Sequence, residues 1–181
     1  MIKKTSNKFI LYIIAIIILF IIPIITIITN YNTLKSGEVF IFKVRSYDPY
    51  DVFRGNYMNI VFDENSVINT SNSIDTLKKV YVEIGKNNDG FGYFKSISNT
   101  KPKNTKTYFK TNCNMYSYNE SKKKYVIDTP NRYYMNEKKS KMAEEILNKN
   151  IKNAYVKVSV KNGKMNVIGL YINDILIDEC I

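Results

Sequence analysis

The sequence contains no histidine and no tryptophan, and it has only two cysteines in 181 residues. Histidine is the commonest side chain that titrates near neutral pH and a preferred zinc ligand, so its absence removes the usual acid–base and zinc chemistry. Two cysteines are too few for a structural zinc site, and with seven glycines there is no glycine-rich loop that could cradle a phosphate. An enzyme made from this chain would need carboxylate, lysine, tyrosine or serine chemistry, and we expect neither a metal nor a cofactor.

Arginine is scarce too, with three residues against 24 lysines, although the chain carries a net charge of +11. Such a lysine excess is typical of an AT-rich genome. It favours a basic surface that is merely solvated over one that binds a particular ligand. Attraction to an anionic wall polymer or lipid stays open as the alternative. The charge is diffuse and follows no recognition motif, so we expect no nucleic acid as a partner.

One uncharged stretch is long enough to cross a bilayer: FILYIIAIIILFIIPIITII, from Phe9 to Ile28. As an α-helix it would be about 30 Å long, the thickness of the hydrocarbon core. The run exceeds the apolar part of a secretory signal peptide, and no small-residue cleavage site follows it, so we expect it to remain attached. Lysines dominate the N-terminal flank, which predicts a cytoplasmic N-terminus. The flanking lysines are Lys3, Lys4 and Lys8 before the run and Lys35 behind it.

The predicted organisation is that of a single-pass protein of the cell membrane. It has a cytoplasmic tail at residues 1–8, a transmembrane helix at 9–29 and an extracytoplasmic domain at 30–181. An outer domain of about 150 residues can bury an adequate core. Both cysteines, Cys113 and Cys180, fall in this outer part, where a disulfide and two free thiols are equally consistent with the sequence.

Short runs rich in Val, Ile, Phe and Tyr, separated by polar turns, indicate that the outer domain is mainly β. Asn87 to Gly90 and Asn162-Gly163 are turn sequences that predict two hairpins. The stretch 64–79 is rich in Asn, Ser and Thr and is predicted to be a loop. The predicted strands are residues 38–45, 56–62, 81–86, 91–97, 107–111, 115–118, 125–128, 155–160, 165–172 and 175–177.

One soluble helix is predicted, from Asn136 to Asn148, because this run is rich in good helix formers. Asn136 can serve as its N-cap, and an apolar stripe predicts the face that packs on the rest of the domain. The stripe consists of Met142, Ala143, Ile146 and Leu147. The predicted fold class is therefore an antiparallel sheet or barrel-like β domain with one short helix, behind a single N-terminal transmembrane helix.

The segment DPYDVFRGNYMNIVF, residues 48–62, resembles the motif of the GDYXXLXY family, which reads G-D-Y-x-x-L-x-Y after D-P-x-D-x-x-R. Gly55 and Tyr57 match the motif, whereas Asn56 stands for its Asp, and Ile60 and Phe62 stand for its Leu and Tyr. Three further stretches resemble the family in the same order along the chain. They are VYVEIGKNNDGFGYF, RYYMNEKKSKMAEEI and YVKVSVKNGKMNVIGLYIND.

The resemblance implies a membrane-anchored bacterial protein without an established activity, so it carries over no catalytic residue. Many members are encoded beside polytopic membrane proteins, which implies membrane association with a partner of that kind. The Asp of the motif is absent here. Asn56 keeps the hydrogen-bonding shape and the tolerance for a turn, so it argues against an essential carboxylate at this position.

All three arginines fall in segments described above, at Arg45, Arg54 and Arg132. A guanidinium pairs bidentately with a carboxylate, which an ammonium cannot do. In a structural interpretation, Arg54 pairs with Asp48 or Asp51 and holds the turn. Arg132 would then clamp a neighbouring segment to that turn. In a functional interpretation, the guanidiniums bind an anionic ligand or a carboxylate of a partner.

We expect the outer domain to be a non-enzymatic binding or assembly module for a membrane or envelope partner. The candidate motif and binding residues are Asp48, Asp51, Arg54, Gly55, Asn56, Tyr57 and Arg132. The alternative is a hydrolase-like envelope enzyme, or a ligand-binding domain, that uses the turn with Asp48, Asp51 and Arg54. Two carboxylates can do acid–base work, but aspartates in turns more often bond the local backbone. We therefore assign no catalytic residue.

Overall fold

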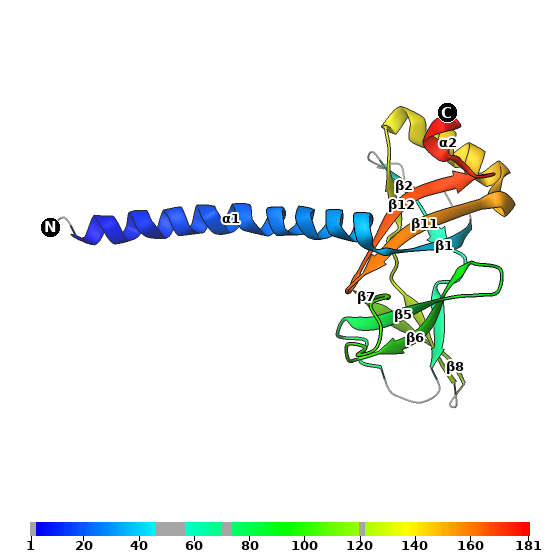
Figure 1. Cartoon of the computed structure of the whole chain (residues 1–181), viewed down its shortest axis with the longest axis horizontal. Coiled ribbons are helices and arrows are strands. Elements are labelled where there is room, and N and C mark those ends of the chain that lie inside the picture. The colour runs from blue at the N-terminus through cyan, green and yellow to red at the C-terminus, as the bar shows by residue number, and fades with distance from the viewer. Residues whose placement is uncertain (1–2, 46–56, 70–73, 120–121) are drawn as a thin grey trace.

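The computed structural model describes residues 3–45, 57–69, 74–119 and 122–181, which form a long N-terminal helix and a β-rich domain (Figure 1). Helix α1 (Lys3–Ser36) projects from the domain as a separate rod, and it is long and apolar enough to span a membrane. The second helix is α2 (Glu137–Lys149). Two short 3-10 helices follow, η1 (Ile151–Asn153) and η2 (Ile177–Glu179).

The strands are short and follow one another along the chain with polar turns between most of them. They are β1 (Glu38–Arg45), β2 (Tyr57–Asn59), β3 (Val61–Phe62), β4 (Ser66–Asn69), β5 (Val80–Lys86), β6 (Gly92–Ser98), β7 (Tyr108–Thr111), β8 (Cys113–Asn119), β9 (Lys122–Ile127), β10 (Arg132–Tyr134), β11 (Ala154–Lys161), β12 (Lys164–Ile172) and β13 (Ile175–Leu176).

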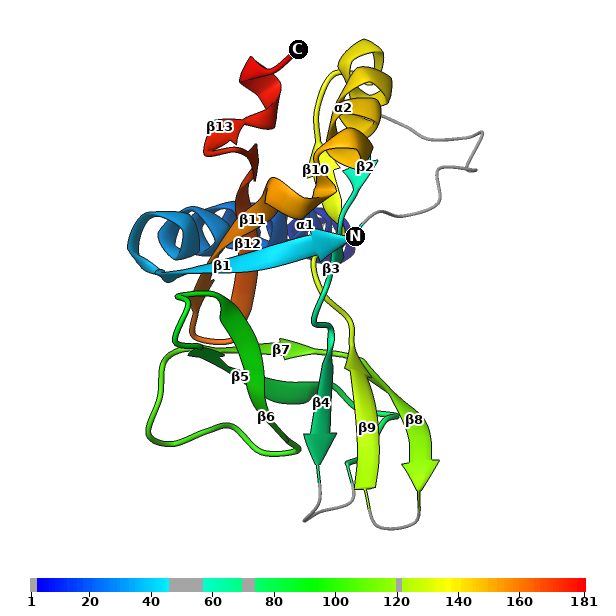
Figure 2. The ribbon, with the colours of Figure 1, turned by 90° about the vertical axis from the view of Figure 1, so that its right-hand side faces the viewer.

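The strands pair antiparallel in four sheets, which confirms the predicted class of a mainly β domain. The largest sheet has the order β13-β12-β11-β1-β3, and the others have the orders β6-β5-β7, β4-β9-β8 and β10-β2. Figure 2 shows the largest sheet in the middle, the two three-stranded sheets below it, and β2, β10 and α2 above it. Within the described residues these sheets do not close into a barrel, so the sheet, and not the barrel-like form, is the observed architecture.

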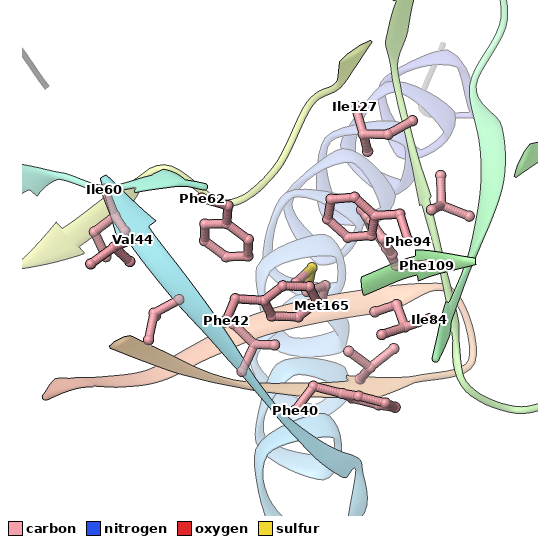
Figure 3. Packing of buried hydrophobic residues seen from close by; sticks show 14 of the residues in the cluster. Phe40, Phe42, Val44, Ile60, Phe62, Ile84, Phe94, Phe109, Ile127 and Met165 are labelled. Carbon is pink, nitrogen blue, oxygen red and sulfur yellow. The ribbon is translucent and has the colours of Figure 1, made fainter. Parts of the chain in front are cut away.

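The core lies between the largest sheet and the two three-stranded sheets. Alternate residues of β1 point inward, and Phe42 contacts Phe62 and Phe94 at ring-centroid distances of 5.1 and 5.3 Å. Figure 3 shows these rings beside Met165 and Phe109, which come from β12 and β7. Each large apolar side chain that is fully buried stabilises the fold by about 1.5–3 kcal/mol relative to exposure. This shared cluster therefore holds the sheets together.

Helix α1 extends beyond the predicted span of 9–29 and continues to Ser36. Hydroxyl groups in its last turns bond to the helix's own backbone: Thr29 Oγ1 donates to Ile25 O at 2.8 Å, and Ser36 Oγ donates to Asn32 O at 2.8 Å. These side chains are satisfied within the helix, and the helix therefore does not end where the apolar run ends.

The strand predictions were wrong in three places, and the first is β10, which was not predicted as a strand. Residues 66–69 of the predicted loop form β4, because β9 supplies a partner in the pairing Ser66↔Val126 to Asn69↔Lys123. The single strand predicted at 56–62 is divided into β2 and β3. The backbone N–H of Ile60 still bonds to Asn131 O, in register with β10, and Val61 and Phe62 then pair with β1. The chain thereby changes partner from β10 to β1.

The predicted helix was confirmed as α2, with Asn136 in the N-cap position, where its carbonyl accepts the N–H of Ser140 at 3.0 Å. Ala143 and Leu147 of the predicted stripe are buried. Met142 is not, since it is 54% exposed, and Ser140 is buried on the packed face in its place. The orientation of the helix follows its packing against β2 and η2, and a small residue fits that contact.

The two cysteines are free thiols in the structure. Cys113 is buried at the start of β8, and burial raises the pKa of its thiol. Cys180 is half-exposed after η2, and its Sγ contacts Leu176 O at 3.6 Å. Of the two alternatives that the sequence left open, the structure therefore has the separate thiols.

Candidate functional site

The motif segment enters the described structure at Tyr57, the first residue of β2. This strand pairs antiparallel with β10 in the register Tyr57↔Tyr134, Met58↔Tyr133 and Asn59↔Arg132. Side chains alternate across such a ribbon, so Met58, which is 0% exposed, packs into the core. Tyr57, Arg132 and Tyr134 lie on the opposite face, and we call these three residues the Tyr–Arg cluster.

The cluster is held together by contacts between its aromatic rings and the guanidinium. Arg132 Cζ lies 4.9 Å from the centroid of the Tyr57 ring, and the Tyr57 and Tyr134 centroids are 6.0 Å apart with an interplanar angle of 60°. Tyr134 is directly opposite Tyr57 in the register, whereas Arg132 reaches it diagonally. An exposed cation–π contact of this kind contributes about 0.5–1 kcal/mol. The outer edge remains open, because Tyr134 is 70% exposed.

The other face of the ribbon is fixed to the end of the chain. The Tyr133 hydroxyl donates a hydrogen bond to the carboxylate of Asp178 in η2. Burial, followed by this bond to a carboxylate, raises the pKa of Tyr133 far above its usual range, so its hydroxyl stays protonated as a donor. Helix α2 also packs against β2. The Tyr–Arg cluster thus rests on a supported strand pair and not on a free loop.

Of the residues predicted for the site, the structure describes Tyr57 and Arg132, which are far apart in the sequence and meet on adjacent strands. Arg45 ends β1 and pairs with Val61 of the motif segment, so it also lies beside the motif. The other five predicted residues lie outside the described residues, and their roles stay predictions. They are Asp48, Asp51, Arg54, Gly55 and Asn56.

Nothing in the described ranges is arranged as a metal centre: no three His, Cys, Asp or Glu side chains there lie close enough together to hold an ion. The polar groups of the Tyr–Arg cluster are phenols and one guanidinium. Such groups donate hydrogen bonds to carboxylates and carbonyls, and the rings add apolar contact area. The arrangement is chemically suited to binding a carboxylate or carbonyl group of another molecule.

The sequence patterns missed a second aromatic group, on β11 and β12. The Tyr155 and Tyr171 rings are stacked, with centroids 5.3 Å apart at 9°, and Lys157 Nζ lies 4.2 Å from the Tyr171 centroid. The Tyr155 hydroxyl donates to Asp174 Oδ1 at 2.7 Å, and burial together with this bond raises the pKa of Tyr155 to about 12.

A β-bulge between Lys157 and Val158 creates this pair of rings. From Lys161↔Lys164 to Val158↔Val167 the hairpin keeps the register of its Asn162-Gly163 turn. Continued without the bulge, that register would place Leu170 opposite Tyr155. The bulge shifts the pairing by one residue and brings Tyr171 there instead. The Asn162-Gly163 turn was the available signal in the sequence, but the register that it predicts places Leu170, and not Tyr171, opposite Tyr155.

The described architecture defines the class of the protein: a mainly antiparallel β domain behind one N-terminal apolar helix. The chain belongs to the GDYXXLXY protein family, whose model matches residues 19–170. The match runs from the second half of the apolar run to β12, and it confirms the resemblance found in the motif segment. Comparison with curated proteins and with solved structures finds no match.

Proposed function

We propose that this protein is anchored in the cell membrane by α1 and that its outer β domain is a non-enzymatic binding module for a membrane or envelope partner. The observation that carries this proposal is the Tyr–Arg cluster. It is an open group of two tyrosines and one arginine on a supported strand pair, and its first residue belongs to the family motif.

The exposure of α1 supports the anchor. The large apolar side chains from Phe9 to Ile28 are exposed, because the domain covers none of this stretch. Lipid tails would cover these side chains, which water solvates poorly. The lysines at the N-terminal flank favour a cytoplasmic N-terminus and an extracytoplasmic domain.

Contacts between α1 and the domain support an anchor that stays attached. Thr33 is only 3% exposed, and its backbone carbonyl accepts a hydrogen bond from the buried Ser159 at 2.5 Å. Removing the helix would expose Ser159 and leave its hydroxyl without this acceptor. The helix therefore has two roles: its apolar run crosses the membrane, and its last turns pack against the domain.

The chemistry of the Tyr–Arg cluster supports recognition of another protein. Tyrosine and arginine are enriched among the residues that carry most of the binding energy of protein interfaces. Stacking on Tyr57 orients the guanidinium of Arg132, which keeps N–H groups for a carboxylate. We therefore expect the partner to be a polytopic membrane protein that presents an acidic side chain on the domain's side of the membrane.

Co-purification of the tagged full-length chain from its own membranes in mild detergent tests this proposal. A stoichiometric polytopic partner should be present with the wild type and lost with Tyr134→Ala and with Arg132→Ala. Tyr116→Ala is a matched control, because Tyr116 is similarly exposed, at 62%, but lies on β8 away from the cluster. Arg132→Ala should lower the melting temperature by no more than about 3 °C, since an exposed cation–π contact is worth about 1 kcal/mol or less.

A chain that purifies alone, or a partner retained equally by all variants, would contradict the proposed docking site. The enzymatic alternative depends on Asp48, Asp51 and Arg54. Turnover of a defined substrate by the purified full-length chain, lost in Asp51→Asn without a change in melting temperature, would favour that alternative instead.

A further inference from the structure

The last turns of α1 lie against the hairpin formed by β11 and β12, and two lysines of the hairpin reach the helix. Lys164 Nζ donates to Thr29 Oγ1 at 2.5 Å and to Asn30 Oδ1 at 3.0 Å. Lys161 Nζ donates to Ser36 Oγ at 2.6 Å. The hairpin tip therefore extends along the helix back toward the end of its apolar run.

Hydrogen bonds and close packing fix the junction between α1 and β1. The backbone N–H of Gly37 donates to Thr33 O at 2.8 Å, and Ser159 Oγ donates to the same carbonyl at 2.5 Å. A Cβ at position 37 would collide with Ser159 Oγ and Thr33 O, so only glycine fits. The hairpin consequently has a defined position along the helix.

The position of the hairpin along α1 also gives the depth of its lysines in the bilayer. This step rests on the proposed function of α1 as a membrane anchor. The apolar run ends at Ile28, and the polar layer of a bilayer adds about 5–8 Å beyond the hydrocarbon on each side. Thr29 is the next residue, and Lys164 Nζ is in hydrogen-bond contact with it. The ammonium of Lys164 then lies in the layer that contains the lipid phosphates, and Lys161, bonded to Ser36, lies about 10 Å farther along the axis.

Between the helix and the hairpin tip there is a hollow of about 530 Å³, large enough for a small ligand. Among the residues that the structure describes, none of those that line it is acidic. Its lining residues are Thr29, Asn32, Thr33, Ser36, Lys161, Asn162 and Lys164. Both ammonium groups face hydroxyl and amide oxygens, and within the described ranges the ion pairs involve other lysines, Lys78 and Lys86. The hollow thus holds two positive charges and several hydrogen-bonding groups, and its described lining residues include no carboxylate that could neutralise them.

We propose that this hollow is a binding site for the headgroup of an anionic phospholipid from the leaflet on the domain's side. Lys164 pairs with the phosphate, the side-chain amide of Asn32 donates to one of its oxygens, and Lys161 contacts the distal part of the headgroup. The depth of Lys164 favours a lipid phosphate over a free anion, because the hollow opens beside the turn that follows the apolar run. Such a site would fix the height and rotation of the domain over the bilayer.

The test uses the full-length chain, purified in mild detergent and incubated with equal amounts of phosphatidylglycerol and phosphatidylcholine, with bound lipids counted by native mass spectrometry. The wild type should retain phosphatidylglycerol preferentially. Each of Lys161→Gln and Lys164→Gln should reduce that preference about fivefold, the effect of one lysine near an anionic headgroup. Lys161→Arg and Lys164→Arg should retain it, which shows that a lost preference does not come from misfolding.

A control variant removes two positive charges elsewhere, one more than each hairpin variant. Lys141→Gln with Lys152→Gln alters two exposed lysines, one on α2 and one in η1 at the opposite end of β11 from Lys161. This double variant should keep the wild-type preference. If it loses the preference as the hairpin variants do, the attraction is a property of the net charge and the proposed site is wrong.

Three further results overturn the inference, and they are distinguishable from failure of the proposed function. Equal retention of the two lipids by the wild type refutes the lipid site alone. Displacement of phosphatidylglycerol by equimolar glycerol phosphate would mean a site for soluble anions. A wild-type chain that fails to enter phospholipid nanodiscs would refute the anchor itself. Partner co-purification, which depends on the Tyr–Arg cluster, should be unchanged by the hairpin variants.

Discussion

Phe42 of β1 and Gly92 of β6 meet where the largest sheet contacts the sheet of β5, β6 and β7, and replacing both tests the packing of the core. A Cβ built on Gly92 would lie only 2.7–3.1 Å from three carbons of the Phe42 ring. Phe42 is buried between Phe62 and Phe94 and has little room to withdraw. We expect Gly92→Ala to destabilise the domain and Phe42→Leu to relieve most of that effect.

The magnitudes follow from opposing terms. Overpacking a buried site costs about 1–3 kcal/mol, while Gly→Ala on unstrained backbone gains about 0.4–1 kcal/mol. The net effect of Gly92→Ala should be a loss of about 1–2 kcal/mol. Truncating a buried Phe to Ala costs about 3–5 kcal/mol, so Phe42→Leu, which keeps part of the volume, should cost about 1–2 kcal/mol. In the double variant the new methyl occupies space left by the ring, and the losses should fall short of their sum by about 1 kcal/mol.

Thermal unfolding of the full-length chain in detergent, followed by the near-ultraviolet circular dichroism of its 15 tyrosines, measures these effects. For a domain of this size 1 kcal/mol corresponds to about 3 °C. Gly90→Ala is the control: Gly90 has φ +83° and nothing within 4 Å of a new Cβ, so its cost is backbone strain. Its effect should add to that of Phe42→Leu. Strict additivity of Gly92→Ala with Phe42→Leu would refute the predicted contact.

Two further predictions concern titratable groups. Because the pKa of Tyr155 is raised to about 12, this phenol's contribution to stability is fully present below its ordinary pKa of about 10 and is lost as the pH rises through about 12. Asp174→Asn should lower that pKa, as followed by phenolate absorbance; an unchanged titration would mean that the hydrogen bond to Asp174 does not contribute. Burial raises the pKa of the Cys113 thiol, so a disulfide reagent should modify Cys180 rapidly and Cys113 only on unfolding. Rapid reaction of both thiols in the folded chain would contradict the burial of Cys113.

Features that depend on neighbouring residues were predictable from the sequence. The richness of residues 38–45 in Val, Ile and Phe predicted β1 with its observed bounds. The turn from Asn87 to Gly90 predicted the hairpin of β5 and β6, because Asn87 Oδ1 accepts the backbone N–H groups of Asp89 and Phe91 and Gly90 supplies the positive φ. These interactions join residues a few positions apart, so the local sequence is enough to predict them.

Features that depend on a partner strand were not predictable in this way. β4 has polar residues and forms because β9 is available to pair with it. Met142 belongs to an apolar stripe but is exposed, because packing against β2 and η2 determines which face of α2 is covered. In both cases the deciding contact comes from a segment distant in the chain.

By itself, the sequence determined the uncharged run in α1, the β class of the domain, the hairpin turns and the family motif, because each depends on composition or on residues a few positions apart. Only the tertiary structure decided that Tyr57 meets Arg132 and that Tyr155 meets Tyr171. The first contact needs β2 and β10 in register, and the second needs a bulge that changes the register of a hairpin. The turn sets the register of a hairpin only as far as a bulge, and the pairing of β2 with β10 joins strands that are far apart in the chain, so neither contact follows from a short pattern of residues.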